Sequence, residues 1–130
     1  MNNETTADLS IAPLLLVADD NEDIRELLAT RFRNRGFEVA TAADGQAAWK
    51  LALSRPPALA ILDWVMPGIQ GHELCVKLKT DPRTANVAVV MVTARGQEED
   101  RLLGMDLGAD AYIVKPFDFD ELERTVRELV

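Results

Sequence analysis

Several short apolar segments of the chain end at polar residues whose side chains could take part in metal and phosphate chemistry. These residues are Asp19, Asp20, Asp63, Thr93 and Lys115. Three carboxylates held close together raise one another's pKa unless a cation neutralises them, and a hard divalent ion such as Mg²⁺ with oxygen ligands would do so. An ammonium opposite them would pair with a carboxylate at rest and with a phosphoryl oxygen after transfer. A carboxylate that is metal-bound and flanked by lysine can attack phosphorus and form an aspartyl phosphate.

The elements that would position these residues can be predicted from the apolar pattern. Short apolar runs that are too short for stable helices are predicted to be buried strands, and they span Leu14–Ala18, Phe37–Thr41, Ala58–Leu62, Val87–Val92 and Ala111–Val114. Segments with apolar residues at helical spacing alternate with them and span Asn21–Arg35, Asp44–Ser54, Gly71–Lys79, Gln97–Leu107 and Phe119–Val130. The residues expected to face inward on the first two helices are Ile24, Leu27, Leu28, Phe32, Ala47, Ala48, Leu51 and Ala52.

This alternation predicts an α/β fold, a doubly wound (βα)5 domain with a five-stranded parallel sheet and helices on both faces. In open sheets of this kind, ligands bind outside the carboxyl ends of the strands. Because Asp19, Asp63, Thr93 and Lys115 all stand at strand ends, we expect their side chains to converge at one edge of the sheet.

Composition excludes several classes of protein. The net charge of −8 disfavours attraction to nucleic acid or to an anionic membrane. The single cysteine, Cys75, allows neither an internal disulfide nor a cysteine-based zinc site, and the single histidine, His72, rules out a multi-histidine metal site. Residues 1–13 lack signal-peptide features and no run approaches the roughly 18–20 apolar residues of a membrane span. We therefore expect a cytoplasmic protein, with residues 1–13 a flexible leader and residues 14–130 one domain.

Four sequence blocks closely resemble the response-regulator receiver domains of two-component signal transduction, the CheY-like family. They are VADD at Val17–Asp20, ILDWVMPG at Ile61–Gly68, VTARG at Val92–Gly96 and YIVKPF at Tyr112–Phe117. The resemblance runs from about Leu14 to Val130 and implies the flavodoxin-like strand order 2-1-3-4-5. It also implies a phosphorylation-activated signalling switch that takes a phosphoryl group from a sensor histidine kinase or a phosphotransfer protein, rather than an enzyme acting on a separate substrate.

Carried over by position, the resemblance implies roles for individual residues. Asp63 would be the phosphoacceptor, and Mg²⁺ would be bound by Asp19, Asp20, Asp63 and the backbone carbonyl of Val65. Thr93 and Lys115 would contact the phosphoryl group, and Tyr112 would change rotamer as Thr93 moves. Val65 and Arg95, two residues beyond Asp63 and Thr93, would tune dephosphorylation. The bond between Lys115 and Pro116 is usually cis in the family.

The resemblance further implies that the face made by the last helix, strand and helix controls an output domain or a target protein. The stretch from Glu99 to Arg127 is similar to the dimerisation face of receivers that drive winged-helix transcription factors, with Arg101 and Glu121 as one salt-bridging pair. Ala111 and Thr125 replace two other charged positions of that face. This loss leaves open a phosphorylation-dependent homodimer, another output class, a stand-alone receiver, or a receiver cut from a longer protein. No direct contact with nucleic acid or membrane is expected.

Rival interpretations are weaker. Phosphatases of the haloacid-dehalogenase kind need a second acid two residues after the nucleophile, where this chain has Val65. The glycine motifs of nucleotide-binding enzymes do not occur. A degenerate receiver that only binds protein is not favoured, because all the phosphorylation groups are present. Among the other residues, Trp64 is expected to be partly exposed, His72 to lie on a helix surface and Cys75 to pack in the core.

Overall fold

The structure is a computed structural model that describes residues 12–130. Residues 1–11 of the predicted leader lie outside the described residues. Strands and helices alternate along the rest of the chain: β1 (Leu14–Ala18), α2 (Glu22–Asn34), β2 (Glu38–Ala42), α3 (Gly45–Ser54), β3 (Leu59–Leu62), α4 (Gly71–Thr80), β4 (Ala88–Thr93), α5 (Glu98–Asp106), β5 (Ala111–Val114) and α6 (Phe119–Leu129).

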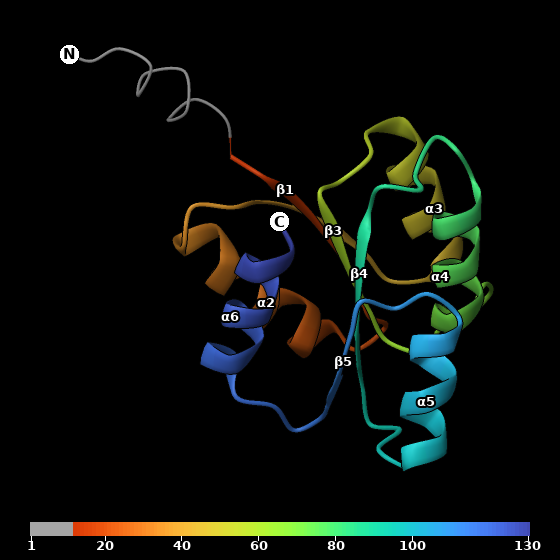
Figure 1. The fold of residues 1–130 in the computed structure, drawn as a ribbon. Helices are drawn as coiled ribbons and strands as arrows, with labels where there is room; N and C mark the ends of the chain where they lie inside the picture. The colour runs from red at the N-terminus through yellow and green to blue at the C-terminus, as the bar shows by residue number, and fades with distance from the viewer. Residues whose placement is uncertain (1–11) are drawn as a thin grey trace.

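The five strands form one parallel sheet in the order β2-β1-β3-β4-β5, which confirms the predicted fold and strand order. Helices α2 and α6 cover one face of the sheet, and α3, α4 and α5 cover the other (Figure 1). The order reverses beside β1, because β2 lies on one side of it and β3 on the other. The carboxyl ends of β1 and β3 therefore flank the crevice in which ligands of such sheets bind.

The alternation of side chains along each strand divides the core into two layers. Leu15 and Val17 of β1 pack towards Phe32 of α2, whereas Leu16 and Ala18 pack towards the α3 and α4 side. Successive side chains of a strand point to opposite faces, so a strand covered on both faces is apolar at every position. This is why the sequence shows continuous apolar runs at the strands.

Every predicted strand and helix is present, with ends that differ by at most one residue from the prediction. Two of these differences come from capping. Asn21 and Asp44 have extended backbones and their side chains accept the N–H groups of Ile24 and Ala47, at 3.1 and 2.8 Å, so each residue precedes its helix. Gly36, with a φ of 95°, follows the end of α2 as predicted.

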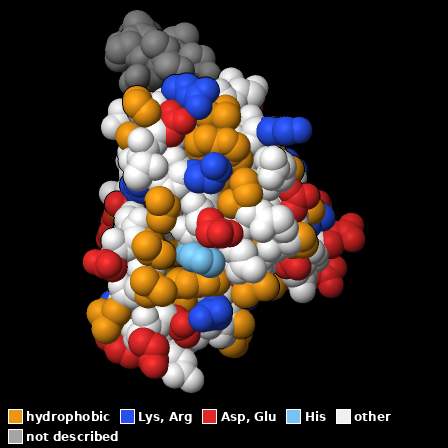
Figure 2. Space-filling view, turned by 90° about the vertical axis from the view of Figure 1, so that its right-hand side faces the viewer, with side chains coloured by type: hydrophobic (Ala, Val, Ile, Leu, Met, Phe, Trp, Pro, Cys, Tyr) orange, Lys and Arg blue, Asp and Glu red, His pale blue; other side chains and the backbone are white. Residues whose placement is uncertain are grey.

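Two expected inward side chains are exposed, which corrects the prediction. Leu27 and Leu51 are 48% and 37% exposed, whereas Ala29 of α2 is fully buried. The sheet contacts a narrower stripe of α2 than the apolar pattern indicates, and Leu27 instead lines a surface groove with Phe117 and Phe119. Helix α5 also presents Leu102, Leu103 and Met105 to solvent. On the face of the molecule seen in Figure 2, apolar side chains lie between charged ones. No helix in residues 12–130 has the length and apolar character needed to cross a membrane.

Candidate functional site

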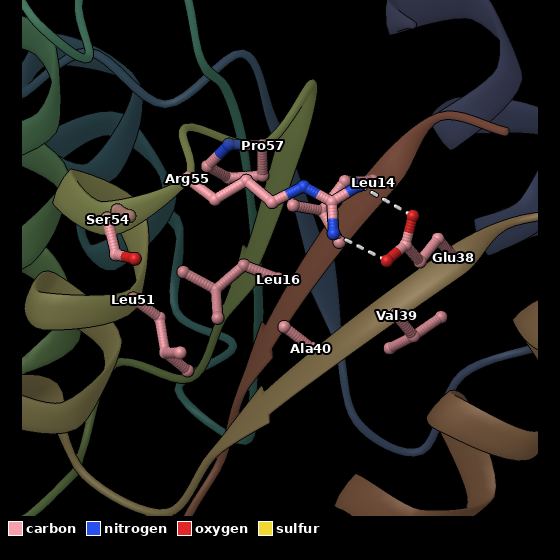
Figure 3. A pocket seen from close by; sticks show the side chains of 10 residues that line it. Leu14, Leu16, Glu38, Val39, Ala40, Leu51, Ser54, Arg55 and Pro57 are labelled. Atoms are coloured by element: carbon pink, nitrogen blue, oxygen red, sulfur yellow. Dashed lines mark hydrogen bonds and ion pairs between the residues drawn. The ribbon is translucent and has the colours of Figure 1, made fainter. Parts of the chain in front are cut away.

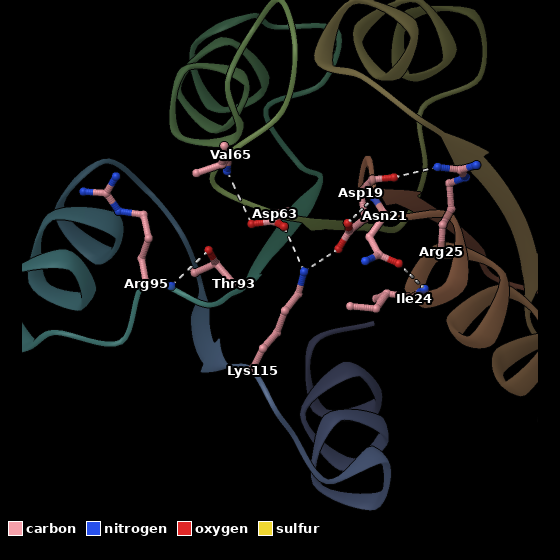
Figure 4. A network of polar contacts seen from close by, with 9 residues as sticks. All are labelled: Asp19, Asn21, Ile24, Arg25, Asp63, Val65, Thr93, Arg95 and Lys115. Carbon is pink, nitrogen blue, oxygen red and sulfur yellow. Dashed lines mark hydrogen bonds and ion pairs between the residues drawn. The ribbon is translucent and has the colours of Figure 1, made fainter.

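The predicted site residues meet at the carboxyl edge of the sheet. Asp19 follows β1, Asp63 follows β3, Thr93 is the last residue of β4 and Lys115 follows β5. Parallel strands bring their carboxyl ends to one edge, and the paired residues Ala18 and Leu62 set Asp19 and Asp63 side by side. Figure 4 shows these side chains pointing toward a common centre.

Lys115 is the central cation of this cluster. Its Nζ lies 2.8 Å from Oδ2 of Asp19 and 2.8 Å from Oδ2 of Asp63. The three side chains are only 15%, 5% and 12% exposed. Burial lowers the pKa of the Lys115 ammonium, but its hydrogen bonds to Asp19 and Asp63 raise the pKa by more, so the pKa lies above the usual lysine value. The lysine is therefore charged at neutral pH and compensates two buried carboxylates.

Asp19 and Asp20 are neighbours in the sequence but differ in their contacts, because Asp19 makes several hydrogen bonds and Asp20 faces solvent. Besides the contact with Lys115, Oδ1 of Asp19 accepts the N–H of Asn21 at 2.9 Å, and its backbone carbonyl accepts a hydrogen bond from Arg25 at 2.9 Å. Asp20 is exposed to solvent beside it. The two neighbouring aspartates thus differ: Asp19 is part of the folded framework, whereas the Asp20 carboxylate is accessible to an ion or to water.

The donor set fits a hard divalent cation. Asp19, Asp20 and Asp63 each offer a carboxylate oxygen, and these oxygens lie within 4.8 Å of one another. Three carboxylates and the Lys115 ammonium carry a net charge of −2, which a divalent ion would neutralise. Val65 contacts this group through its amide, which donates to Oδ1 of Asp63 at 3.3 Å; the use of its carbonyl as a ligand stays a prediction.

Thr93 and Tyr112 are linked through the backbone of Arg95. Thr93 is buried, and its Oγ1 accepts the N–H of Arg95 at 3.3 Å. The hydroxyl of Tyr112 donates to the carbonyl of Arg95 at 2.6 Å. Burial, followed by the nearby Asp100 carboxylate, raises the pKa of Tyr112 above its ordinary value of 10.0, although the charge of Arg95 opposes this. The hydroxyl, and with it this hydrogen bond, persists at neutral pH.

Trp64 is 3% exposed, and the prediction that it is partly exposed is wrong. Its ring stacks on His72 of α4 with centroids 4.8 Å apart, and the Arg95 guanidinium lies 4.8 Å from its centroid. Gly71 permits this arrangement, because its N–H donates to the Trp64 carbonyl at 2.8 Å and a Cβ there would lie 1.8 Å from the Asp63 carbonyl. His72 is consequently partly buried, with Nδ1 buried and without a hydrogen-bond partner in the described part of the chain.

Further predicted residues lie as follows. Cys75 is buried in the core as predicted, and burial raises the pKa of its thiol to about 11. The Lys115–Pro116 bond is cis. Arg101 forms its salt bridge with Glu98 of the same helix, at 2.6 Å, while Glu121 lies on α6; their pairing across an interface stays a prediction.

Sequence reasoning missed Arg25 and Gly71 as residues that shape the site. The signal for Arg25 was a cation on the helix that begins directly after the aspartate pair. The close approach at Gly71 depends on the position of α4 against β3, which no local pattern reports.

A small hollow of about 220 Å³ lies away from this cluster, at the amino ends of β1 and β2 (Figure 3). It is lined by apolar side chains such as Leu16 and Leu51, and Arg55 forms two hydrogen bonds of 2.5 and 2.6 Å with Glu38 beside it. A larger groove, of about 650 Å³, adjoins Lys115 and is lined by Ile24, Leu27 and Phe117. The acidic cluster and this groove share the carboxyl edge of the sheet.

A flavodoxin-like sheet with an acidic cluster and a lysine at its carboxyl edge defines the class of CheY-like signalling domains. The family model of the response regulator receiver domain matches residues 15–127, and the chain belongs to that family of two-component signalling proteins. The domain is a signalling regulator rather than a conventional enzyme.

Individual proteins with similar sequence or structure agree with this assignment. The chain is 39% identical over 118 residues to the DNA-binding dual master transcriptional regulator RpaA of Synechocystis, covering 91% of this chain and 49% of that protein. It is 41% identical to the phosphate regulon transcriptional regulatory protein PhoB of Rhizobium meliloti, covering 91% and 52%. The chemotaxis response regulator CheY4 of Vibrio cholerae superposes with a TM-score of 0.86 at 28% identity, covering 92% of this chain and all of the other. The chain spans about half the length of the curated relatives that it matches.

Proposed function

We propose that this receiver domain is a switch that is activated by phosphorylation of Asp63. The observation that carries the proposal is the Asp63 carboxylate itself. It is 12% exposed, lies 2.8 Å from the Lys115 ammonium and shares a cluster with two further aspartates. A carboxylate with a neighbouring ammonium and two further carboxylates that could hold a divalent ion is suited to nucleophilic attack on phosphorus.

In the proposed reaction, an oxygen of Asp63 forms a bond to the phosphorus of a phosphohistidine as the P–N bond breaks. The electron pair of that bond goes to the imidazole nitrogen. The sensor histidine kinase or phosphotransfer protein is thereby released with an unmodified histidine. Mg²⁺ would be held by Asp19, Asp20, Asp63 and the Val65 carbonyl, and when bound it would neutralise the negative charge of the carboxylates and the incoming phosphoryl group. Lys115 would keep its charge throughout and move from carboxylate to phosphoryl oxygen.

The signal would be read by Thr93, whose hydroxyl would turn from the Arg95 amide to the phosphoryl group. Tyr112 would change its contacts in response, since it is linked to the same backbone segment. The face formed by α5, β5 and α6 would then shift toward a form that binds an output domain, a target protein or a second copy of the domain, with Arg101 and Glu121 at its interface. Val65 and Arg95 would set how fast water reaches the phosphoryl group.

Two relatives are named as transcriptional regulators, one of them DNA-binding, and this chain corresponds to about half of each. We infer that the output of the switch is control of a second domain or protein. A receiver that only binds protein, without being phosphorylated, is the alternative, and the same experiment separates the two.

The experiment is to incubate the protein with acetyl phosphate and to follow intact mass. A single phosphoryl adduct is expected with Mg²⁺, and none with a chelator or in the Asp63→Asn variant. Asp106→Asn is the matched control, because Asp106 is an exposed aspartate on α5 away from the cluster. An adduct that survives Asp63→Asn, or no adduct under any condition, would overturn the proposal and favour the binding module.

A further inference from the structure

Arg95, in the segment after β4, contacts several parts of the molecule at once. Its guanidinium lies 4.8 Å from the centroid of the Trp64 ring and donates to Oδ1 of Asp100, on α5, at 2.9 Å. Its backbone amide donates to Thr93 and its carbonyl accepts from Tyr112. One residue therefore connects the loop after β3, the end of β4, the first turn of α5 and β5.

The two side-chain contacts reinforce each other. A guanidinium is planar and can stack on an aromatic face while its edge donates to a carboxylate. Trp64 and the Asp100 side chain are 3% and 16% exposed, whereas Arg95 is 47% exposed. The arginine thus lies at the surface and covers two groups that are largely withdrawn from water.

Helix α5 buries little of its surface against the rest of the described chain. The only residue of α5 that is buried is Gly104, where a Cβ would lie 3.0 Å from the Tyr112 ring and 3.5 Å from Trp64. The helix therefore rests on Tyr112 and Trp64 through a residue without a side chain. The ion pair between Arg95 and Asp100, at the first turn of α5, therefore contributes strongly to the stability of the helix in this position.

Trp64 directly follows the proposed phosphoacceptor Asp63 in the chain. Its ring also contacts the edge of Tyr112, with centroids 6.3 Å apart. A chemical change at Asp63 thus occurs one residue away from the aromatic ring that the Arg95 guanidinium covers. The same guanidinium is hydrogen-bonded to Asp100 of α5.

We propose that Arg95 is a positioning residue that latches the Asp63–Trp64 segment to the first turn of α5, and that phosphorylation loosens this latch. The second part rests on the proposed function. A phosphoryl group on Asp63 would attract the Arg95 guanidinium away from Asp100 and would draw the Thr93 hydroxyl away from the Arg95 amide. Both changes remove interactions that hold the first turn of α5 near Trp64. They therefore raise the population of a form in which this turn no longer contacts Arg95.

The resting latch is tested by amide hydrogen exchange of residues 98–106 in the unphosphorylated protein, read by mass spectrometry. Loss of a stacked cation and one partly exposed ion pair corresponds to roughly five-fold faster exchange. We expect this increase in Arg95→Gln and a smaller one in Asp100→Asn. Because the two residues act as one unit, the double variant should exchange no faster than Arg95→Gln. Arg95→Lys should restore part of the protection, since lysine keeps the charge.

Arg83→Gln is the matched control, because Arg83 is an exposed arginine whose ion pair with Asp81 lies in the segment between α4 and β4, outside α5. It should leave the exchange within a factor of two of the wild-type rate, by the same energy scale. If Arg95→Gln exchanges no faster than this control, the latch is rejected, whether or not the protein can be phosphorylated. A cooperative urea transition of each variant confirms that it is folded.

The coupling is tested by repeating the exchange on samples brought to equal phosphoryl occupancy by intact mass. Phosphorylation should speed exchange of the first turn of α5 in the wild type and should have little further effect in Arg95→Gln. If Arg95 had a purely structural role, phosphorylation would speed exchange of the first turn of α5 in Arg95→Gln as much as in the wild type. That result would overturn the proposed coupling. Failure of the wild type to take a phosphoryl group would instead refute the proposed function, and with it the coupling, while the resting-state exchange still decides the latch.

Discussion

The ammonium of Lys115 lies 2.8 Å from Oδ2 of Asp63, although 52 residues separate the two in the sequence. The same ammonium lies 2.8 Å from Asp19. One cation thus compensates two nearly buried carboxylates, and Asp20 adds a third beside them. Stability and cation affinity are linked through this lysine, because removal of its charge leaves a cluster that only another cation can neutralise.

Replacement of Lys115 by methionine should therefore destabilise the protein in a way that Mg²⁺ corrects. Without a divalent cation, we expect a loss of about 1–3 kcal/mol in the free energy of unfolding, since Asp19 and Asp63 lose their partner. Mg²⁺ should stabilise the variant more than the wild type, because binding to the more negative cluster is tighter. Urea denaturation with a chelator and with Mg²⁺ measures both. Lys50→Met is the control, as Lys50 is exposed on α3; equal Mg²⁺ stabilisation of Lys115→Met and the wild type would contradict this account.

The two neighbouring aspartates should separate stability from cation binding. Asp19→Asn should cost about 1–2 kcal/mol, because the side chain is 5% exposed and hydrogen-bonded to Lys115 and to the amide of Asn21. Asp20→Asn should stay within about 0.5 kcal/mol, because the side chain is exposed. Both should weaken Mg²⁺ binding, measured by tryptophan fluorescence titration. A destabilisation of Asp20→Asn as large as that of Asp19→Asn, in the absence of Mg²⁺, would refute the distinction.

Gly71→Ala should be among the most damaging substitutions near the site. A Cβ at this position would lie 1.8 Å from the carbonyl oxygen of Asp63 and 3.0 Å from Cα of Trp64, and backbone atoms cannot move aside cheaply. We expect a loss of more than about 3 kcal/mol or failure to fold. At Gly104 the atoms nearest to an added Cβ would be ring atoms of the Tyr112 and Trp64 side chains. Gly104→Ala should therefore change stability by less than about 1 kcal/mol, since better helix propensity offsets the crowding. Thermal unfolding followed by circular dichroism compares the pair, and equal effects would contradict the contacts.

Tyr112, the only tyrosine, should titrate above pH 10. Burial and the Asp100 carboxylate disfavour the tyrosinate. Since the folded-state pKa is raised, the associated stability is fully present below pH 10 and is lost as the pH rises through the folded-state pKa. Ultraviolet absorbance of the tyrosinate measures the midpoint. Asp100→Asn should lower that midpoint and Asp106→Asn should not; a midpoint at or below 10 in the wild type would show that the ring is solvated.

The fold was predictable because each element carries its own signal. Runs such as Leu14–Ala18 are apolar throughout, which is expected only of strands covered on both faces, and Gly36 follows the end of α2. The position of Asp19, Asp63, Thr93 and Lys115 directly at strand ends then required their convergence, since parallel strands share one carboxyl edge. The strand order came from the family resemblance rather than from any local pattern.

Some features of the site were decided only by the tertiary structure, because they depend on how closely the helices and strands approach one another. Trp64 is buried because Gly71 allows α4 to pack against the Asp63–Trp64 backbone, and Leu27 is exposed because the sheet covers a narrow stripe of α2. The contacts of Arg95 with Trp64 and Asp100 follow from the same packing. Residue types and spacing determine which face of an element is apolar, because periodicity is local. Distances between elements depend on how all the side chains between them pack together, and this packing is present only in the folded chain.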